Sequence, residues 1–146
     1  MELGNSFKIS ASALTAQRKR IDAISSNLAN AQTTRTAEGG PYRRKEVVFG
    51  SEPVRKNFSD VLDESKDVDA QEVHVVDVQS SDKPPIAKYE PNHPDADPDG
   101  YVYYPDINTM KEMADMMNAQ RSYEANVNSM NISKSMALKA LEIGKN

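Results

Sequence analysis

Several residue types are scarce or missing in this 146-residue chain, and each absence narrows what the protein can be. Cysteine is absent, so disulfide bonds and thiolate metal sites are excluded. Tryptophan is absent too, and aromatic residues make up only 6% of the sequence. A chain of this length normally buries enough apolar surface to fold alone, but this one has few large apolar side chains. We therefore expect neighbouring subunits to supply part of its burial.

Long apolar runs are also missing. No stretch is apolar over the roughly 20 residues that a membrane-spanning helix needs. The first eight residues, MELGNSFK, lack the apolar segment of a cleavable signal peptide. The sequence therefore predicts no direct membrane span and no cleaved signal.

Charge is unevenly distributed along the chain, whose formal net charge is −4. Residues 51–106 hold 14 acidic and 5 basic side chains, whereas residues 1–50 hold 8 basic and 4 acidic ones. Because nucleic-acid binding needs a basic face, the acidic middle argues against a nucleic-acid partner. We interpret this acidic middle as solvated surface.

Glycine and proline are absent between Phe7 and Asn30, and this segment has a helical pattern. Apolar residues recur there at every seventh position, namely at Phe7, Leu14, Ile21 and Leu28. This spacing predicts a helix over residues 3–30 with a narrow apolar stripe. Asn30 is a suitable end for it, because asparagine tolerates the left-handed cap conformation.

A second segment without glycine or proline runs from Ile107 to Ile143 and predicts a long helix over residues 107–143. Asn108 can cap its start, with Glu112 in the first turn. Spacings of three and four alternate along a coiled-coil-like stripe with polar interruptions at Gln120 and Lys134. We call this stripe the seam, and it comprises Met113, Met116, Gln120, Tyr123, Val127, Met130, Lys134, Ala137 and Leu141.

The middle of the chain, residues 31–106, holds all 8 prolines and 4 of the 6 glycines. Between these breakers lie short runs rich in valine and tyrosine, which favour strands. The predicted strands are Tyr42–Phe49, Glu72–Val78, Ile86–Tyr89 and Tyr101–Tyr104. The acidic stretch 59–71 is interpreted as a loop or a short helix.

These patterns together predict an α+β fold. Two long terminal helices pair as an antiparallel, coiled-coil-like hairpin, and a small irregular β module is inserted between them. We expect a discontinuous helical domain of residues 1–30 and 107–146, and a β-rich outer module of residues 31–106. Because isolated helix pairs are marginally stable, we expect other copies to complete the packing.

Four sequence blocks resemble the flagellar basal-body rod proteins, and in particular the proximal-rod proteins of the FlgC type. They are ALTAQ at 13–17 with Ile21 and SNLANAQT at 26–33, TTRT at 33–36 with EGGPYRR at 38–44, HPDAD at 93–97 with GYV at 100–102, and EMADMMNA at 112–119 with RSYEANV at 121–127. They cover about half of the chain and occur in this order. The wider axial family continues after Thr33 with any residue, glycine and tyrosine. Here Thr34 and Arg35 follow, as in the FlgC-type branch.

The resemblance implies a subunit that polymerises with itself and with other rod proteins into a hollow helical tube across the periplasm. Such a tube contacts the inner-membrane ring and the rod-base adaptor, transmits torque and surrounds the export channel. Its subunits leave the cytoplasm through the flagellar type III export channel without a cleaved signal. The terminal helices would line the tube, and the middle module would face outward. The residues assigned to assembly, from the family motif and the seam, are Leu14, Gln17, Ile21, Asn27, Leu28, Asn30, Met113, Met116, Tyr123, Asn126, Val127, Met130 and Leu141.

The alternatives to a rod subunit are a calcium-binding loop, an enzyme and a monomeric binding module. Asp95, Asp97, Asp99 and Gly100, with Asp106 further on, have the spacing of a calcium loop. Pro91 and Pro94 block the helix that should enter such a loop, so we interpret the segment as a proline-rich turn and expect no metal or other cofactor. No acid–base or nucleophile pattern indicates an enzyme. The alternative function is a monomeric helical binding module or adaptor that uses the methionine-rich seam.

Overall fold

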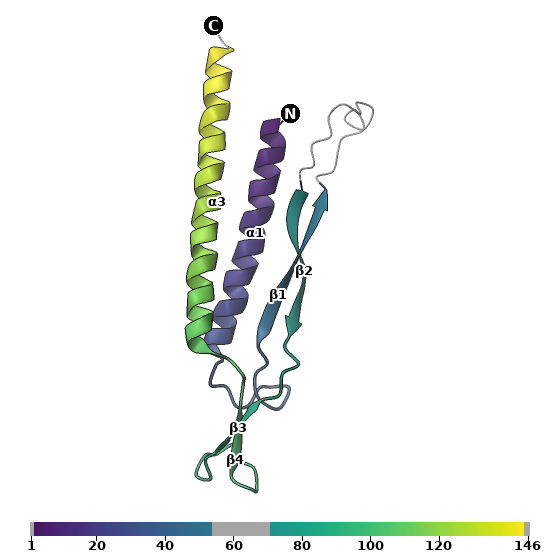
Figure 1. Ribbon diagram of the computed structural model, residues 1–146, viewed down its shortest axis with the longest axis vertical. Coiled ribbons are helices and arrows are strands. Elements are labelled where there is room, and N and C mark those ends of the chain that lie inside the picture. The colour runs from purple at the N-terminus through teal and green to yellow at the C-terminus, as the bar shows by residue number, and fades with distance from the viewer. Residues whose placement is uncertain (1, 54–70, 145–146) are drawn as a thin grey trace.

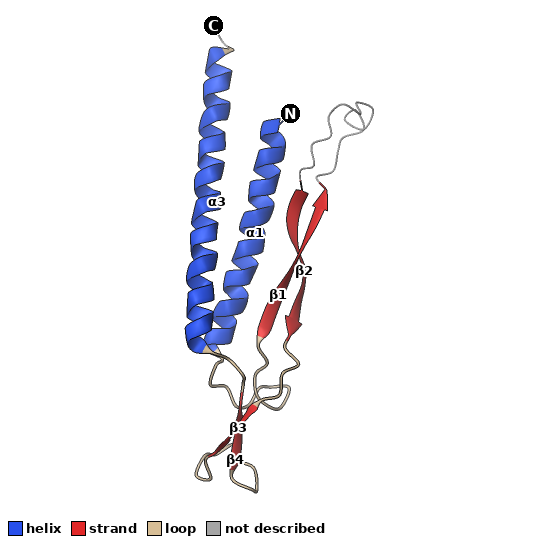
Figure 2. Ribbon diagram, in the orientation of Figure 1, coloured by secondary structure: helices blue, strands red, loops and turns tan. Residues whose placement is uncertain are grey.

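The computed structural model describes residues 2–53 and 71–144. The described part of the chain is elongated and comprises two helices and two antiparallel strand pairs (Figures 1 and 2). The elements in chain order are α1 (Glu2–Ala29), β1 (Lys45–Pro53), β2 (Gln71–Ser80), β3 (Ile86–Tyr89), β4 (Tyr101–Tyr104) and α3 (Thr109–Ile143). The acidic stretch 59–71 lies outside the described residues except for Gln71, which begins β2.

The two terminal helices pack side by side and run in opposite directions (Figure 1). This confirms the predicted antiparallel pair and the α+β class. Asn108 caps α3 as expected, since its side-chain Oδ1 accepts a hydrogen bond from the Lys111 backbone nitrogen at 3.1 Å. Neither described helix combines the length and the apolar character that crossing a membrane requires.

The middle of the chain forms two separate antiparallel hairpins. Strands β1 and β2 pair from Lys45 with Ser80 to Pro53 with Gln71, with a bulge between Val48 and Phe49. This hairpin packs along α1 on the side opposite α3, so α1 is the central layer of three (Figure 1). The sequence predicted the strands but not this position against α1.

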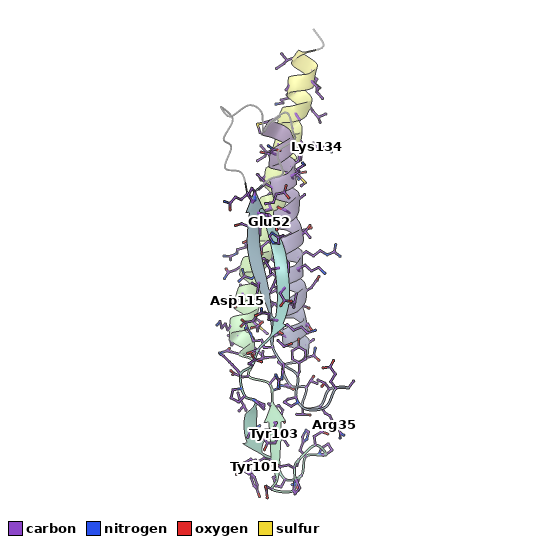
Figure 3. All side chains as sticks on the ribbon, turned by 90° about the vertical axis from the view of Figure 1, so that its right-hand side faces the viewer. Arg35, Glu52, Tyr101, Tyr103, Asp115 and Lys134 are labelled. Atoms are coloured by element: carbon purple, nitrogen blue, oxygen red, sulfur yellow. The ribbon has the colours of Figure 1, made fainter. Side chains whose placement is uncertain are left out.

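The second hairpin pairs β3 with β4 beyond the end of the helix pair (Figure 1). Tyr101 and Tyr103 therefore lie far along the molecule from Lys134 of α3 (Figure 3). Gly100 precedes β4 with φ +82, and a Cβ there would lie 2.9 Å from the Tyr89 ring. Both the backbone conformation and the close ring require glycine at this turn.

The buried core is thin and mostly made of small residues. Among the described residues, the buried apolar ones are Ala16, Ala23, Ile24, Val102 and Ala119. The largest side chains that are fully buried include Asn27 and Glu112, which are polar or charged. Small side chains let the layers approach closely, but they bury little apolar surface. The intramolecular core is therefore held in part by polar contacts.

Candidate assembly surface and the junction beneath it

A buried polar junction joins the three layers where α1 ends and α3 begins. Asn27 of α1 is 0% exposed, and its side-chain amide nitrogen and oxygen each form two hydrogen bonds. Its Nδ2 donates to the Lys45 backbone oxygen at 2.9 Å and to Glu112 Oε2 at 3.1 Å. Its Oδ1 accepts from the Lys45 backbone nitrogen at 2.7 Å and from the Tyr42 hydroxyl at 3.1 Å. All four hydrogen-bonding positions of the amide are occupied, and the amide pairs with Lys45 as a neighbouring strand would.

Glu112 carries a charge into the same junction and is only 1% exposed. Arg44 Nε donates to Glu112 Oε1 at 2.7 Å, so the buried carboxylate has a cationic partner. Arg44 also contacts Glu46 on the exposed side. The position of Glu112 in the first turn of α3 favours its negative charge, because the helix dipole is positive there. A buried charge of this kind is tolerated only when it is paired and hydrogen-bonded.

The side of α3 that faces α1 has a different composition from the predicted seam. Met116, Tyr123, Val127, Met130 and Ala137 are half-buried. Gln120 and Lys134, predicted as polar interruptions, are exposed, and Ala119 and Ser133 take the inward positions instead. The inward-facing stripe begins at Glu112, one residue before Met113, where the predicted seam begins. Asn126 is also half-buried.

Other apolar residues of α3 remain exposed and form the candidate assembly surface. At the start of the helix, Met110, Met113 and Met117 share one face through spacings of three and four. At its end, the exposed residues are Ile132, Met136, Leu138, Leu141 and Ile143. Leu141 belongs to the predicted seam, yet it is 67% exposed.

The exposure of Leu141 follows from the unequal lengths of the helices. The contact between Asn27 and Glu112 fixes the antiparallel register, and it places residue 2 level with residue 137. Residues 138–143 therefore extend beyond the start of α1 (Figure 1). This overhang has apolar side chains, and no helix among the described residues of its own chain faces it.

The motif residues of α1 lie along or next to its contact with α3. Leu14, Gln17, Ile21 and Leu28 are half-buried, and Gln17 Oε1 is buried without a hydrogen-bond partner among the described residues. Asn30 ends the helix, with its Nδ2 donating to the Ser26 carbonyl at 2.9 Å. Most of the assigned residues of both helices are thus half-buried or buried, whereas Met113 and Leu141 are exposed.

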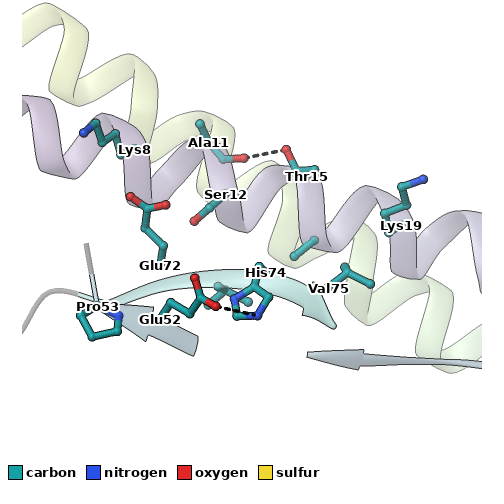
Figure 4. Close-up of a pocket in the computed structure, with 12 residues that line it drawn as sticks. Lys8, Ala11, Ser12, Thr15, Lys19, Glu52, Pro53, Glu72, His74 and Val75 are labelled. Atoms are coloured by element: carbon teal, nitrogen blue, oxygen red, sulfur yellow. Dashed lines mark hydrogen bonds and ion pairs between the residues drawn. The ribbon is translucent and has the colours of Figure 1, made fainter. Parts of the chain in front are cut away.

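A groove of about 700 Å³ lies between residues 8–19 of α1 and the part of the β1–β2 pair near Pro53 (Figure 4). The two hydroxyl groups that line it form hydrogen bonds within α1. Ser12 donates to the Ile9 carbonyl at 2.8 Å, and Thr15 donates to the Ala11 carbonyl at 2.9 Å. His74 lies 3.8 Å from the carboxylate of Glu52. The Ser12 and Thr15 hydroxyls thus have structural roles within α1.

The acidic segment before β4 forms a tight turn. Asp97 Oδ1 accepts hydrogen bonds from the backbone nitrogens of Asp99 at 3.0 Å and Tyr101 at 2.8 Å. Asp95 Oδ2 accepts from the Thr34 hydroxyl at 2.8 Å. No group of three histidine or acidic side chains suited to a metal ion occurs in the part of the chain that the structure describes. The carboxylates of Asp95 and Asp97 thus stabilise the turn.

Ionisable groups around this turn influence one another. The hydrogen bond from Lys88 lowers the pKa of Glu90, and the Tyr104 hydroxyl lowers it further. The same carboxylate raises the pKa of Lys88 and of Tyr104. The negative charge of Asp97 raises the pKa of Tyr103. These shifts widen the pH range over which the ion pair is charged and both tyrosines are neutral.

Models of flagellar rod protein families match both ends of the chain. Residues 7–35 match the family model of the flagella basal body rod protein, and residues 99–143 match that of the flagellar basal body rod FlgEFG protein C-terminal. The matched segments contain most of α1 and all of α3, and hence most of the helix pair. These features define the class of flagellar basal-body rod proteins.

Similar proteins narrow the class. The chain is 45% identical over 148 residues to the flagellar basal-body rod protein FlgC of Bacillus subtilis (strain 168), covering 97% of each chain. It is 43% identical to FlgC of Borreliella burgdorferi, covering 98% of each, and 41% identical to FlgC of Escherichia coli O157:H7, covering 99% of this chain and all of the relative. The chain belongs to the FlgC family of flagellar basal-body rod proteins and is a structural subunit of the rod.

Sequence reasoning missed the central residue of the junction, Glu112. It was interpreted as a first-turn residue of α3 and not as a buried one, because glutamate is almost never fully buried unless it is paired. Its partners Arg44 and Asn27 lie 68 and 85 positions away. The only signal was that all three residues fall within the resembling blocks.

Proposed function

We propose that this chain polymerises, with itself and with other rod proteins, into the hollow helical tube of the proximal rod. In this proposal the tube transmits torque and surrounds the export channel. Residues 1–30 and 107–146 form its wall, and residues 31–106 form an outer module. The observation that carries the proposal is the apolar overhang of α3, which no helix in the described part of the chain faces.

The proposal includes location and partners. We infer that the chain reaches the periplasm through the flagellar export channel without a cleaved signal, and that the rod base meets the inner-membrane ring and its adaptor. Support comes from the relatives, all named as basal-body rod proteins. We also propose a role without catalysis, because the hydroxyl groups in the main groove bond to their own helix.

The family-motif residues of α1 and the seam residues of α3 are assigned to assembly in this proposal. Ile21, Leu28, Val127 and Leu141 become buried between subunits, and the half-buried state of the first three in the single chain leaves room for further contact. Val127 also faces α1, so a charge there would disturb the single chain as well. Leu141 is the cleaner test position, because it lies on the overhang.

The test is to replace Leu141 by aspartate in a motile strain that depends on this chain. Burying an unpaired carboxylate between subunits costs several kcal/mol, so we expect export of Leu141→Asp but no rod and no swimming. Asn131→Asp is the matched control, because it adds the same charge at an exposed polar position of α3 and should leave swimming intact. Normal swimming of the Leu141→Asp strain, with the variant present in purified basal bodies, would contradict the proposal.

A further inference from the structure

One face of the β3–β4 hairpin consists largely of tyrosine rings. The strand register pairs Tyr89 with Tyr101 and Ala87 with Tyr103, and alternate residues of a strand share a face. Tyr89, Tyr101 and Tyr103 therefore lie together, and we call them the tyrosine face. They are 64%, 42% and 42% exposed. Val102, which points to the other side, is fully buried, so the hairpin packs on one face and leaves the tyrosine face open.

Contacts within the single chain fix the positions of the tyrosine rings. The rings of Tyr89 and Tyr101 form an edge-to-face pair with centroids 5.4 Å apart. The Tyr103 hydroxyl donates to Asp97 Oδ2 at 3.3 Å, and Gly100 fits closely against the Tyr89 ring. Rigid tyrosines with a polar end lose little conformational entropy on binding, and this makes them effective at protein interfaces.

The residues around the tyrosine face are mostly acidic, and they favour a cationic partner. Residues 86–106 contain one basic side chain, Lys88, and five acidic ones, Glu90, Asp95, Asp97, Asp99 and Asp106. Exposed aromatic faces attract lysine and arginine, and neighbouring carboxylates strengthen that attraction. The chain already uses this contact internally, because Lys88 Nζ lies 5.8 Å from the centroid of the Tyr104 ring and Lys45 Nζ lies 6.0 Å from that of Tyr42.

Two exposed cations of α1 in the same chain carry the complementary charge. Arg18 and Lys19 are adjacent and exposed on α1, whereas Arg43 and Arg44 already contact Asp82 and Glu46. Arg18 is eleven residues before the end of α1, which is roughly 16 Å along the helix axis. The tyrosine face lies beyond that end of the helix pair (Figures 1 and 3). One chain therefore cannot bring its own two surfaces together.

We propose that the tyrosine face of one copy binds the Arg18–Lys19 surface of a second copy. The inference rests on the proposed polymerisation and adds which surfaces meet. Each copy offers two different surfaces, an acidic aromatic one and a basic one, so the contact is heterologous. Heterologous contacts that do not close into a ring generate open helical polymers, as a rod requires.

The test uses the natural absence of cysteine, because every cross-link then comes from introduced positions. A chain carrying Asp99→Cys and Arg18→Cys is produced as the sole copy in a motile strain. Its basal bodies are purified and treated with a short bis-maleimide. The control pairs Asp99→Cys with Arg121→Cys, because the helix register places the exposed Arg121 level with Arg18 on the other helix.

We expect cross-linked dimers and larger multimers with Arg18→Cys and none with Arg121→Cys. Equal cross-linking in both pairs, or none with Arg18→Cys in basal bodies that contain the variant, overturns the inference. Absence of the unmodified chain from basal bodies instead overturns the proposed function itself, so the two failures are distinguishable.

Charge exchange provides a second readout if a cysteine variant fails to assemble. Asp99→Lys or Arg18→Glu alone should cause loss of swimming, and the two together should restore it. Restoration supports the inference, and equal loss in the double variant overturns it. Tyr101→Phe keeps the ring and should swim, whereas Tyr101→Ser removes the ring and should not. Normal swimming of Tyr101→Ser also counts against the contact.

Discussion

Asn27 Nδ2 donates to Glu112 Oε2 at 3.1 Å, although the two residues are 85 positions apart in the sequence. Both side chains are fully buried, and together they fix where α3 begins relative to the end of α1. The same asparagine holds the backbone of Lys45 at the start of β1. One amide thus sets the positions of all three layers, and this sets the length of the α3 overhang.

Replacement of Asn27 by alanine should therefore destabilise the whole molecule. It leaves the Lys45 backbone groups and part of the Glu112 carboxylate without partners, so we expect a loss of about 3 kcal/mol in the free energy of unfolding. Urea unfolding of the purified chain measures this loss. Asn118→Ala, at an exposed position of α3, should stay within about 0.5 kcal/mol of the unmodified chain. Similar effects of the two substitutions would show that the junction does not hold the layers together.

The pair of Arg44 and Glu112 should show strong coupling in a double-mutant cycle. Removal of Arg44 leaves the buried Glu112 charge without its cation, so Arg44→Met alone should lower the free energy of unfolding by about 3 kcal/mol. Arg44→Met together with Glu112→Met should cost less than the two single effects combined, because no buried charge is left unpaired. Additive effects would mean that Arg44 does not compensate the Glu112 charge.

The second hairpin should weaken in acid through Glu90. The pKa of Glu90 is lowered in the folded chain, first by its hydrogen bond from Lys88 and then by the one from Tyr104. A lowered folded pKa means that the contribution is present at neutral pH and is lost as the pH falls through that value. An NMR titration should give Glu90 a midpoint below its ordinary value and a higher one in Tyr104→Phe. An ordinary midpoint in the unmodified chain would contradict the described hydrogen bonds.

Much of the fold could be predicted from local patterns in the sequence. Ile86–Tyr89 and Tyr101–Tyr104 were predicted with their observed bounds, because prolines and glycines mark the ends of these short strands. The helices were predicted to within about two residues for a similar reason, since they lack such breakers. Their antiparallel pairing follows from two apolar stripes at the two ends of one chain.

The layer order and the junction could not be predicted in this way. The position of the β1–β2 hairpin against α1 depends on contacts between distant segments, and no periodicity encodes them. The inward position of Glu112 depends on Arg44 and Asn27, whose proximity only the folded chain reveals. A buried charge breaks the apolar pattern on which the seam prediction relied, so the predicted stripe began one residue late at Met113.

The most direct measurement compares the reactivity of position 141 in the free chain and in the rod. Leu141→Cys introduces the sole cysteine of the protein at a position that is 67% exposed in the single chain. Maleimide should label it rapidly in the purified monomer and very slowly in intact basal bodies, whereas Asn131→Cys serves as an exposed reference. Strong protection of position 141 on assembly is the predicted result. Equally rapid labelling in basal bodies that contain the variant would show that the α3 overhang is not an assembly surface.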